Sequence, residues 1–305
     1  MSGLLDVAII VAFLEAGVRL GIPLALAALG ETVSERAGVL NLGLEGAIIA
    51  GALGAALGAL DTGSPVLGVL LGGVAGAAVA LVFAVFVVGL NVDQIIAGTA
   101  ITLGGLGFTA AVYEARFGTT GTALTLPTLD PVAIPLLSSI PVLGPVFFSQ
   151  APTAYLTYLL APALAWFLYR TSAGLQLRAV GEAPDAAAAA GVRVRRIRFV
   201  ATVAGGFLAG LAGAHLSLAY AGTFAEGMSA GRGFIAIAVV VLGRWNPILV
   251  LFAALFFGVA SALQFFLQNL GFDIGYQIFL AVPYILTLAA LGGWVGRARA
   301  PAALA

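Results

Sequence analysis

The sequence predicts an all-α protein, built as a polytopic bundle of transmembrane helices. Hydrophobic residues make up 62% of the 305 residues, and the mean hydropathy is +1.13. Charged residues make up only 9%, whereas a soluble domain carries about 25%. So few charges cannot cover the surface of a soluble protein of this length. We therefore expect a single multi-pass domain over residues 1–305, in the cell membrane.

Apolar runs of about 20 residues, the length that spans a bilayer, recur along the chain. About nine spans are expected, within a range of eight to ten. The first, Leu4–Leu29, lacks the basic start of a signal peptide. The run at 233–243 is short, and it is either a crossing or a re-entrant, broken element. The remaining predicted spans are 39–60, 64–89, 94–113, 152–169, 199–220, 247–268 and 276–293.

The arginines predict the orientation, because cytoplasmic loops are enriched in basic residues. With nine crossings and the N-terminus outside, ten Arg fall on the cytoplasmic side. Only Arg116 and Arg232 then fall outside, and the C-terminus is cytoplasmic. Four aromatic residues near the ends of spans are expected to anchor the protein at the membrane interfaces: Trp166, Tyr169, Trp245 and Trp294.

The composition excludes several classes of function. There is no Cys and only one His, so thiolate clusters and multi-histidine metal sites are not expected. There is no Lys, which the phosphate loop of a Walker-type ATPase requires. His215 and Ser217 lie on different helix faces and lack a second base, so catalysis there is disfavoured. No catalytic residue, metal site or nucleic-acid partner is predicted.

Glycines within the spans recur at intervals of three or four residues, a spacing that lets helices approach closely. The pattern predicts a tightly packed bundle and gives no information about a substrate. The glycines concerned are Gly51, Gly54, Gly58, Gly68, Gly72, Gly76, Gly205, Gly206, Gly210 and Gly213.

Two polar residues open the second predicted span. Asn41 and Glu45 are four positions apart and share one helix face. Inside a membrane such groups are unfavourable unless they face protein or water. Two interpretations stay open: a structural network that supports a broken helix, or a wall of a solute path. Further candidates for that path are Gln94, Thr99, Thr102 and Phe234, the last of which also suits an aromatic belt.

Other polar residues within the spans have structural explanations. Glu15 and Arg19 are four positions apart with Glu first, the favourable order for an ion pair within a helix. Glu31, Glu35 and Arg36 are close enough in sequence to pair locally. The single histidine is expected to be a packing residue.

Two long loops separate the spans. The proline-rich segment 114–151 is expected outside, either as a partly ordered cap or as a docking surface for an external partner. On the cytoplasmic side, the loop 170–198 contains Pro184 and Asp185, which suit a helix N-terminus, and Gly191, which suits a helix end. Between them we expect a two-turn, alanine-rich helix. It either fits a groove on another protein or rests on anionic lipid through the neighbouring arginines.

The stretch Gly181–Val192 resembles the EAA-type coupling loop of ABC import permeases. Glu182, Ala183, Ala187 and Gly191 occupy matching places. In that family the short helix of this loop docks into a cleft on a cytoplasmic ATPase. The resemblance therefore implies an ATPase-coupling site made of Gly181, Glu182, Ala183, Pro184, Asp185, Ala187 and Gly191.

The stretch Gly30–Gly46, which ends in Asn-Leu-Gly-Leu-Glu-Gly, closely resembles permeases of nucleoside ABC importers. Ribose-type relatives tend to read Gly-Gly-Ile-Asp-Leu-Ser here, and amino-acid-type relatives tend to end in His-Gly. The resemblance extends over roughly residues 15–295 and includes the segments 94–99 and 236–247. Thr102 is a departure, because many members of the nucleoside branch have Asn at that position.

The resemblance implies the membrane permease subunit of an ABC importer for nucleosides or related ribosides. It implies four partners: a cytoplasmic ABC ATPase that binds ATP and Mg²⁺, a second permease subunit that is a paralogue, an extracellular or lipoprotein solute-binding protein, and membrane lipid. No cofactor is expected on this chain. The alternatives are a ribose-type sugar permease or a branched-chain amino-acid permease. An ion-coupled transporter with Glu45 as a proton relay is disfavoured by the coupling-loop pattern.

Overall fold

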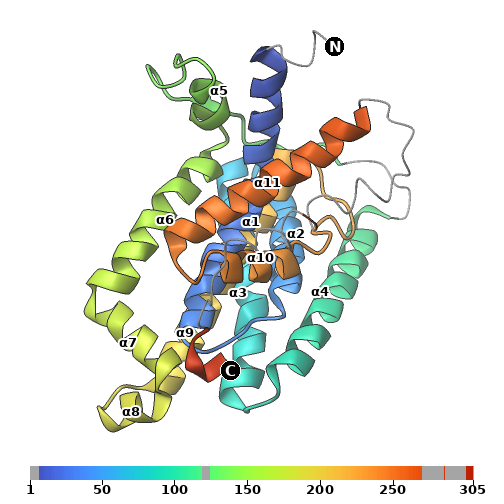
Figure 1. Cartoon of the computed structure of the whole chain (residues 1–305). Helices are drawn as coiled ribbons and strands as arrows, with labels where there is room; N and C mark the ends of the chain where they lie inside the picture. Colours follow the sequence, from blue (N-terminus) through green and yellow to red (C-terminus); the bar gives the residue numbers. More distant parts are fainter. Residues whose placement is uncertain (1–6, 119–123, 270–284, 286–299, 305) are drawn as a thin grey trace.

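The computed structural model describes residues 7–118, 124–269, 285 and 300–304. Within these ranges, six helices are long and apolar enough to cross a membrane. They lie side by side and form the body of the molecule (Figure 1). Two of them, α3 and α9, continue as π-helical turns to Gly89 and Ala221. The six are α1 (Val7–Arg36), α2 (Leu44–Thr62), α3 (Pro65–Ala84), α4 (Gln94–Phe117), α9 (Val194–Ala214) and α11 (Pro247–Asn269).

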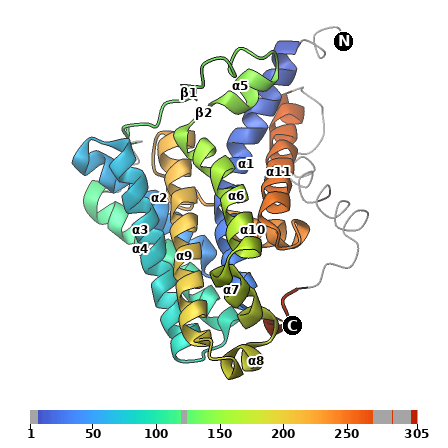
Figure 2. The same ribbon diagram turned by 90° about the vertical axis from the view of Figure 1, so that its left-hand side faces the viewer.

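The remaining elements are shorter or more polar. Helix α6 (Pro152–Arg170) has 19 residues, runs along the bundle (Figure 2) and packs on α1 and α11. A two-stranded antiparallel ladder joins β1 (Val132–Ala133) to β2 (Ser149–Gln150), with Val132 opposite Gln150. The short helices are α5 (Leu143–Phe148), α7 (Ser172–Glu182), α8 (Pro184–Ala189), α10 (Arg232–Leu242) and the 3₁₀ turn Ala302–Leu304.

The all-α prediction is confirmed, but the described residues contain six helices that are long and apolar enough to cross a membrane, against nine predicted spans. The difference has three sources. The predicted span 276–293 lies outside the described residues, apart from residue 285. The span predicted at 152–169 is α6, whose three tyrosines and two prolines make it less apolar than the six. The run at 233–243 is α10, a helix of 11 residues, which is too short to cross a bilayer alone.

The bundle has two distinct ends. The start of α1 and helix α5 lie at one end, and α8 and residues 301–304 lie at the other (Figure 1). We call these the α5 end and the α8 end. Helix α10 lies near the middle of the bundle (Figure 1). The turn after α10 reaches the C-terminus of α1, because the Arg36 side chain donates hydrogen bonds to the carbonyls of Arg244 and Trp245.

Glycines bring the central helices into close contact, as their spacing predicts. A Cβ atom added to Gly76 of α3 would overlap the Gly206 carbonyl of α9. A Cβ atom on Gly213 of α9 would likewise overlap the Ile48 carbonyl of α2. Helices α2, α3 and α9 therefore pack backbone against backbone, which only glycine permits at these contacts.

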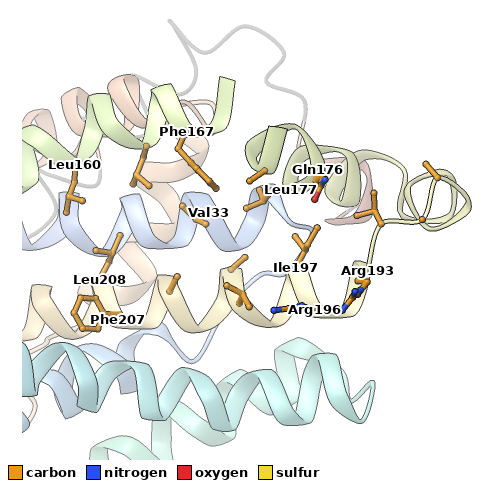
Figure 3. Close-up of a pocket in the computed structure, with 18 residues that line it drawn as sticks. Val33, Leu160, Phe167, Gln176, Leu177, Arg193, Arg196, Ile197, Phe207 and Leu208 are labelled. Atoms are coloured by element: carbon orange, nitrogen blue, oxygen red, sulfur yellow. The ribbon is translucent and has the colours of Figure 1, made fainter. Parts of the chain in front are cut away.

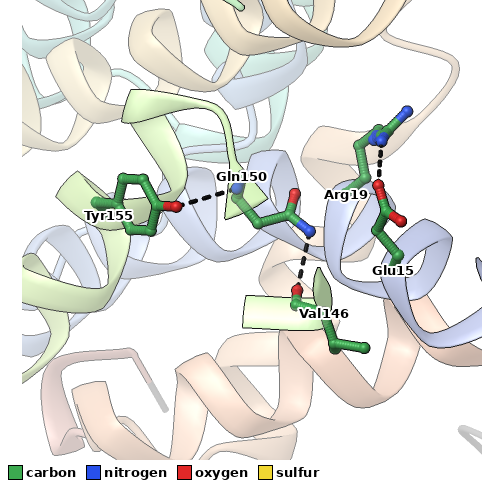
Figure 4. A network of polar contacts seen from close by, with 5 residues as sticks. All are labelled: Glu15, Arg19, Val146, Gln150 and Tyr155. Carbon is green, nitrogen blue, oxygen red and sulfur yellow. Dashed lines mark hydrogen bonds and ion pairs between the residues drawn. The ribbon is translucent and has the colours of Figure 1, made fainter. Parts of the chain in front are cut away.

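The loop at the α5 end is ordered by polar contacts over its described part. The Tyr155 hydroxyl accepts a hydrogen bond from the Gln150 amide at 3.0 Å and donates one to the Val132 carbonyl. The Gln150 side chain donates to the Val146 carbonyl at 2.8 Å (Figure 4). These contacts join the ladder, α5 and the start of α6 into one cap.

Two structural expectations for polar residues are confirmed. Arg19 and Glu15 form an ion pair at 2.6 Å on α1, close to the cap (Figure 4). His215 is buried, and its Nδ1 atom lies 2.6 Å from the Thr153 hydroxyl. The histidine is therefore a packing residue that joins α9 to α6.

One of the predicted interfacial anchors is wrong. Trp166 and Tyr169 are exposed near the end of α6, as interfacial residues should be, and Trp294 lies outside the described residues. Trp245 instead is only 5% exposed. Its indole N–H donates a hydrogen bond to the Glu35 carboxylate. Trp245 is therefore buried in the protein rather than placed at the membrane interface, because the buried Glu35 carboxylate accepts its indole N–H.

Candidate functional site

The centre of the candidate site is the N-terminus of α10. The Glu45 carboxylate accepts hydrogen bonds from the amides of Gly231 at 2.7 Å and Gly233 at 2.6 Å. Glu45 is only 4% exposed and lies in the first turn of α2. Free N–H groups and the helix dipole make a helix N-terminus attractive to an anion. The Glu45 carboxylate therefore holds the start of α10 in place. We call α10 the broken helix, because it is too short to cross a bilayer alone.

Glycine makes this contact possible. A Cβ atom on Gly233 would lie 2.7 Å from the Glu45 Cα atom, too close for any other residue. Arg232, between the two glycines, turns back and donates to the carbonyls of Met228 and Ser229 at 2.9 and 3.1 Å. Arg232 was expected in an external loop. The structure places it half-buried in the first turn of α10 instead.

Three further residues of the predicted solute path fix the segment that precedes α2. The Asn41 side chain accepts from the Gly43 amide at 3.0 Å. The Gln94 side chain accepts from the Leu40 amide at 2.9 Å, and the Thr102 hydroxyl donates to the Leu42 carbonyl at 2.9 Å. Their polar atoms thus meet backbone groups of residues 40–43. The geometry favours the structural interpretation for Asn41, Glu45, Gln94 and Thr102.

The two other candidates lie outside this network. Thr99 is exposed, and its hydroxyl donates to the Ile95 carbonyl of its own helix at 2.8 Å. The Phe234 ring is 51% exposed, one residue after the amide that binds Glu45. Both side chains are exposed and therefore accessible to a partner molecule, whereas the network residues bind other segments of this chain.

A pair of buried carboxylates lies near the C-terminal end of α1, close to the broken helix. Glu31 is fully buried and accepts from the Asn41 amide at 2.7 Å, and Glu35 is 2% exposed and accepts from Trp245. The local pairing expected for Glu31, Glu35 and Arg36 is wrong. Glu31 instead binds the Asn41 amide, and Glu35 and Arg36 both bind Trp245, more than 200 positions away, which their spacing along α1 does not reveal. The only feature of the sequence that could have pointed to these partners was the position of Trp245 in a predicted turn.

The loop 170–198, which we call the coupling loop after the resemblance described above, folds as predicted around its proline and glycine. Helix α8 starts at Pro184, in the first helical position, with Asp185 in its first turn. Gly191 has a φ of 82°, a left-handed conformation that suits glycine just beyond a helix. Ala187 is buried, whereas Glu182, Ala183 and the remaining alanines of the helix are exposed. The loop thus presents a smooth, polar-edged surface at the α8 end.

Sequence reasoning missed helix α7, which precedes the coupling helix. Thr171 caps its N-terminus by accepting from the Gly174 amide at 3.0 Å. Its last turn packs on the C-terminus of α1, where a Cβ atom on Gly181 would overlap the Arg36 carbonyl. Since Arg36 also binds the turn after α10, one residue connects the coupling loop with the broken helix.

Comparisons with known proteins agree with this architecture. Residues 13–291 match the family described as branched-chain amino acid transport system / permease component. The guanosine ABC transporter permease protein NupQ of Bacillus subtilis is 41% identical, over 92% of this chain and 91% of NupQ. The nucleoside ABC transporter permease protein NupC of Lactococcus lactis is 33% identical, over 92% of this chain and 91% of NupC.

A third relative carries a different substrate name. The putative glucose ABC transporter permease protein TsgC13 of Haloferax volcanii is 38% identical, over 91% of this chain and 90% of that protein. No solved structure matches the chain.

The apolar helices and the family together indicate a multi-pass protein of the inner membrane. Such a permease is a transport subunit rather than an enzyme, and the family implies an ATPase and a second permease subunit as partners. The chain therefore belongs to the branched-chain amino acid transport system permease family and is the membrane permease subunit of an ABC importer.

Proposed function

We propose that this permease moves nucleosides or related ribosides into the cell. The observation that carries the proposal is the similarity over more than nine tenths of the chain to permeases named for guanosine and nucleosides. The stretch Gly30–Gly46, which contains Asn41 and Glu45, supplies the motif of the same branch. Sugar transport is the second candidate, because TsgC13 is named for glucose.

The geometry at α10 supports an uncharged solute. In transporters, the N-terminus of a broken helix commonly binds an anionic group of the substrate. Here the Glu45 carboxylate already occupies the two amides at that position. An amino-acid carboxylate would have to displace it, whereas a neutral nucleoside or sugar would not. We place the solute beside the exposed Phe234 and Thr99, on a path between this chain and the second permease subunit.

The proposed orientation has the α8 end in the cytoplasm and the α5 end outside. Eight arginines of the described ranges lie in or next to elements of the α8 end: Arg36, Arg170, Arg178, Arg193, Arg195, Arg196, Arg198 and Arg244. Such an excess marks the cytoplasmic side. Nine crossings follow if α6, the segment through α10 and the residues after α11 each cross once. The cap at the α5 end then faces the solute-binding protein.

We further propose that Gly181–Gly191 couples transport to the separate ATPase, which holds the ATP and Mg²⁺. Its exposed face consists of small side chains with Glu182 and Asp185 at one end. Movement of α7 would reach α10 through Arg36, which contacts both elements. This route gives the coupling loop a physical connection to the centre of the membrane domain.

The test is uptake into proteoliposomes that contain this chain with its second permease, ATPase and binding protein. Labelled guanosine, cytidine, glucose and leucine are compared in the presence of ATP. We expect nucleoside uptake, reduced at least tenfold by Glu182→Arg and unchanged by Glu114→Arg, an exposed charge on α4. Uptake of glucose or leucine alone would overturn the substrate assignment, and equal effects of the two variants would overturn the coupling assignment.

A further inference from the structure

A long apolar groove opens on the surface of the α8 half of the bundle. Its cavity volume is about 990 Å³. Helices α6 and α7 form one wall and α9 forms the other, with Val33 of α1 between them (Figure 3). Leu160, Phe207 and Leu208 lie at one end of the groove (Figure 3). None of the 18 residues that line it is acidic.

The opposite end of the groove carries two arginines, Arg193 and Arg196 (Figure 3). Three other arginines of this region are engaged by carbonyl groups. Arg178 donates to Leu168 at 2.9 Å, Arg195 to Val88 at 3.3 Å and Arg198 to Ala37 at 3.2 Å.

Arg193 and Arg196 are exposed. Their guanidinium groups make no hydrogen bond or ion pair to any residue that the structure describes. Two arginines with unpaired guanidinium groups thus line the groove. A positively charged mouth on an apolar channel is complementary to a molecule with an anionic head and a hydrocarbon tail.

The dimensions of the groove fit one bilayer leaflet. Arg196 and Leu208 are twelve positions apart on α9, which corresponds to about 18 Å along the helix axis. The hydrocarbon of a single leaflet is about 15 Å thick. With Leu208 near the middle of the bilayer, the guanidinium groups therefore lie at the level of the lipid headgroups. This alignment places both arginines where a phosphate would be.

We propose that the groove binds one anionic phospholipid of the cytoplasmic leaflet, with its phosphate between Arg193 and Arg196 and an acyl chain along α9. The leaflet assignment rests on the proposed orientation. The lipid lies between α7, which leads into the coupling helix, and α9, which follows it. A bound lipid would therefore hold the two sides of the coupling loop at a fixed separation.

The test is native mass spectrometry of the assembled importer in detergent, with phosphatidylglycerol and phosphatidylethanolamine as probes. We expect phosphatidylglycerol to be retained in preference to phosphatidylethanolamine. The double variant Arg193→Gln/Arg196→Gln should weaken its binding roughly 30-fold, since each arginine near an anionic headgroup contributes a factor of about five. Arg170→Gln, an exposed arginine outside the groove, is the matched control and should leave binding unchanged.

A second variant tests the apolar part of the groove. Ala204 is exposed on the groove face of α9, so Ala204→Trp should fill the channel and release the lipid while both arginines remain. Leu103→Trp, on the exposed face of α4, is its control. Equal retention of the two lipids, or unchanged binding in the double variant, would overturn the proposal. So would crosslinking of a cysteine at position 204 to the second permease, because a protein would then fill the groove.

Lipid retention is measured without a transported solute. Loss of the lipid site with intact nucleoside uptake would therefore overturn only this inference. Retained lipid without nucleoside uptake would overturn only the proposed substrate.

Discussion

Replacement of Glu45 by alanine tests whether this residue supports the broken helix α10. The change removes the acceptor of two amides, those of Gly231 and Gly233, and leaves Gly233 buried without a partner. An unsatisfied buried donor costs about 1–3 kcal/mol, and loss of a charge at a helix N-terminus adds about 0.3–2 kcal/mol. The free energy of unfolding should therefore fall by about 4 kcal/mol. Glu45→Gln keeps one acceptor oxygen and should show about half of that loss.

Thermal unfolding of the purified importer in detergent measures this effect. A loss of about 4 kcal/mol corresponds to a decrease in Tm of roughly 10 °C for a large domain. Glu226→Ala is the control, because this carboxylate is exposed in the segment just before α10 and its removal should shift Tm by less than about 2 °C. If Glu45→Ala kept the wild-type Tm but abolished uptake, Glu45 would act on the solute, and the structural interpretation would be refuted.

Three further predictions concern packing, a buried hydrogen bond and orientation. Gly210→Leu should destabilise the fold by more than about 3 kcal/mol in thermal unfolding, because its side chain would enter the backbone of α3. Trp245→Phe removes the donor to the buried Glu35 carboxylate and should lower the free energy of unfolding by about 1–3 kcal/mol. Because the chain has no Cys, Ser64→Cys and Ala190→Cys can be labelled singly with an impermeant maleimide in intact cells. Ser64→Cys should react directly, and Ala190→Cys only after permeabilisation.

Matched variants separate these effects from general damage. Gly104→Leu should be tolerated, since a Cβ atom there meets nothing within 4 Å. Trp166→Phe should be neutral, because that indole is 64% exposed. A stability loss in either control equal to that in its test variant would contradict the packing argument. Labelling of position 190 before position 64 would contradict the proposed orientation.

Local features were the most predictable from the sequence. The coupling helix begins at Pro184 and is followed by the left-handed Gly191, because backbone restrictions of these two residues act within a few positions. The Glu15–Arg19 pair and the close glycine contacts also follow from spacing along one helix.

Contacts between distant segments could not be predicted. Glu45 is 186 positions from Gly231, and no property of either segment specifies that they meet. Trp245 has the composition of an interfacial anchor, and only the fold places a buried carboxylate beside it. The solute-path residues were chosen because a polar residue in an apolar span indicates a polar partner. The sequence does not identify whether that partner is a solute or another part of the protein. For five of the six path residues, the partner is the backbone of this chain.

The most direct test of the account is the energy source of transport. Proteoliposomes with the complete importer are loaded with ATP on the cytoplasmic face, and accumulation of labelled guanosine is measured with and without a protonophore. For an ABC permease, accumulation should require ATP and the ATPase subunit and should persist when the proton gradient is dissipated. Accumulation by this chain without the ATPase, abolished by the protonophore and by Glu45→Gln, would contradict it and identify an ion-coupled transporter.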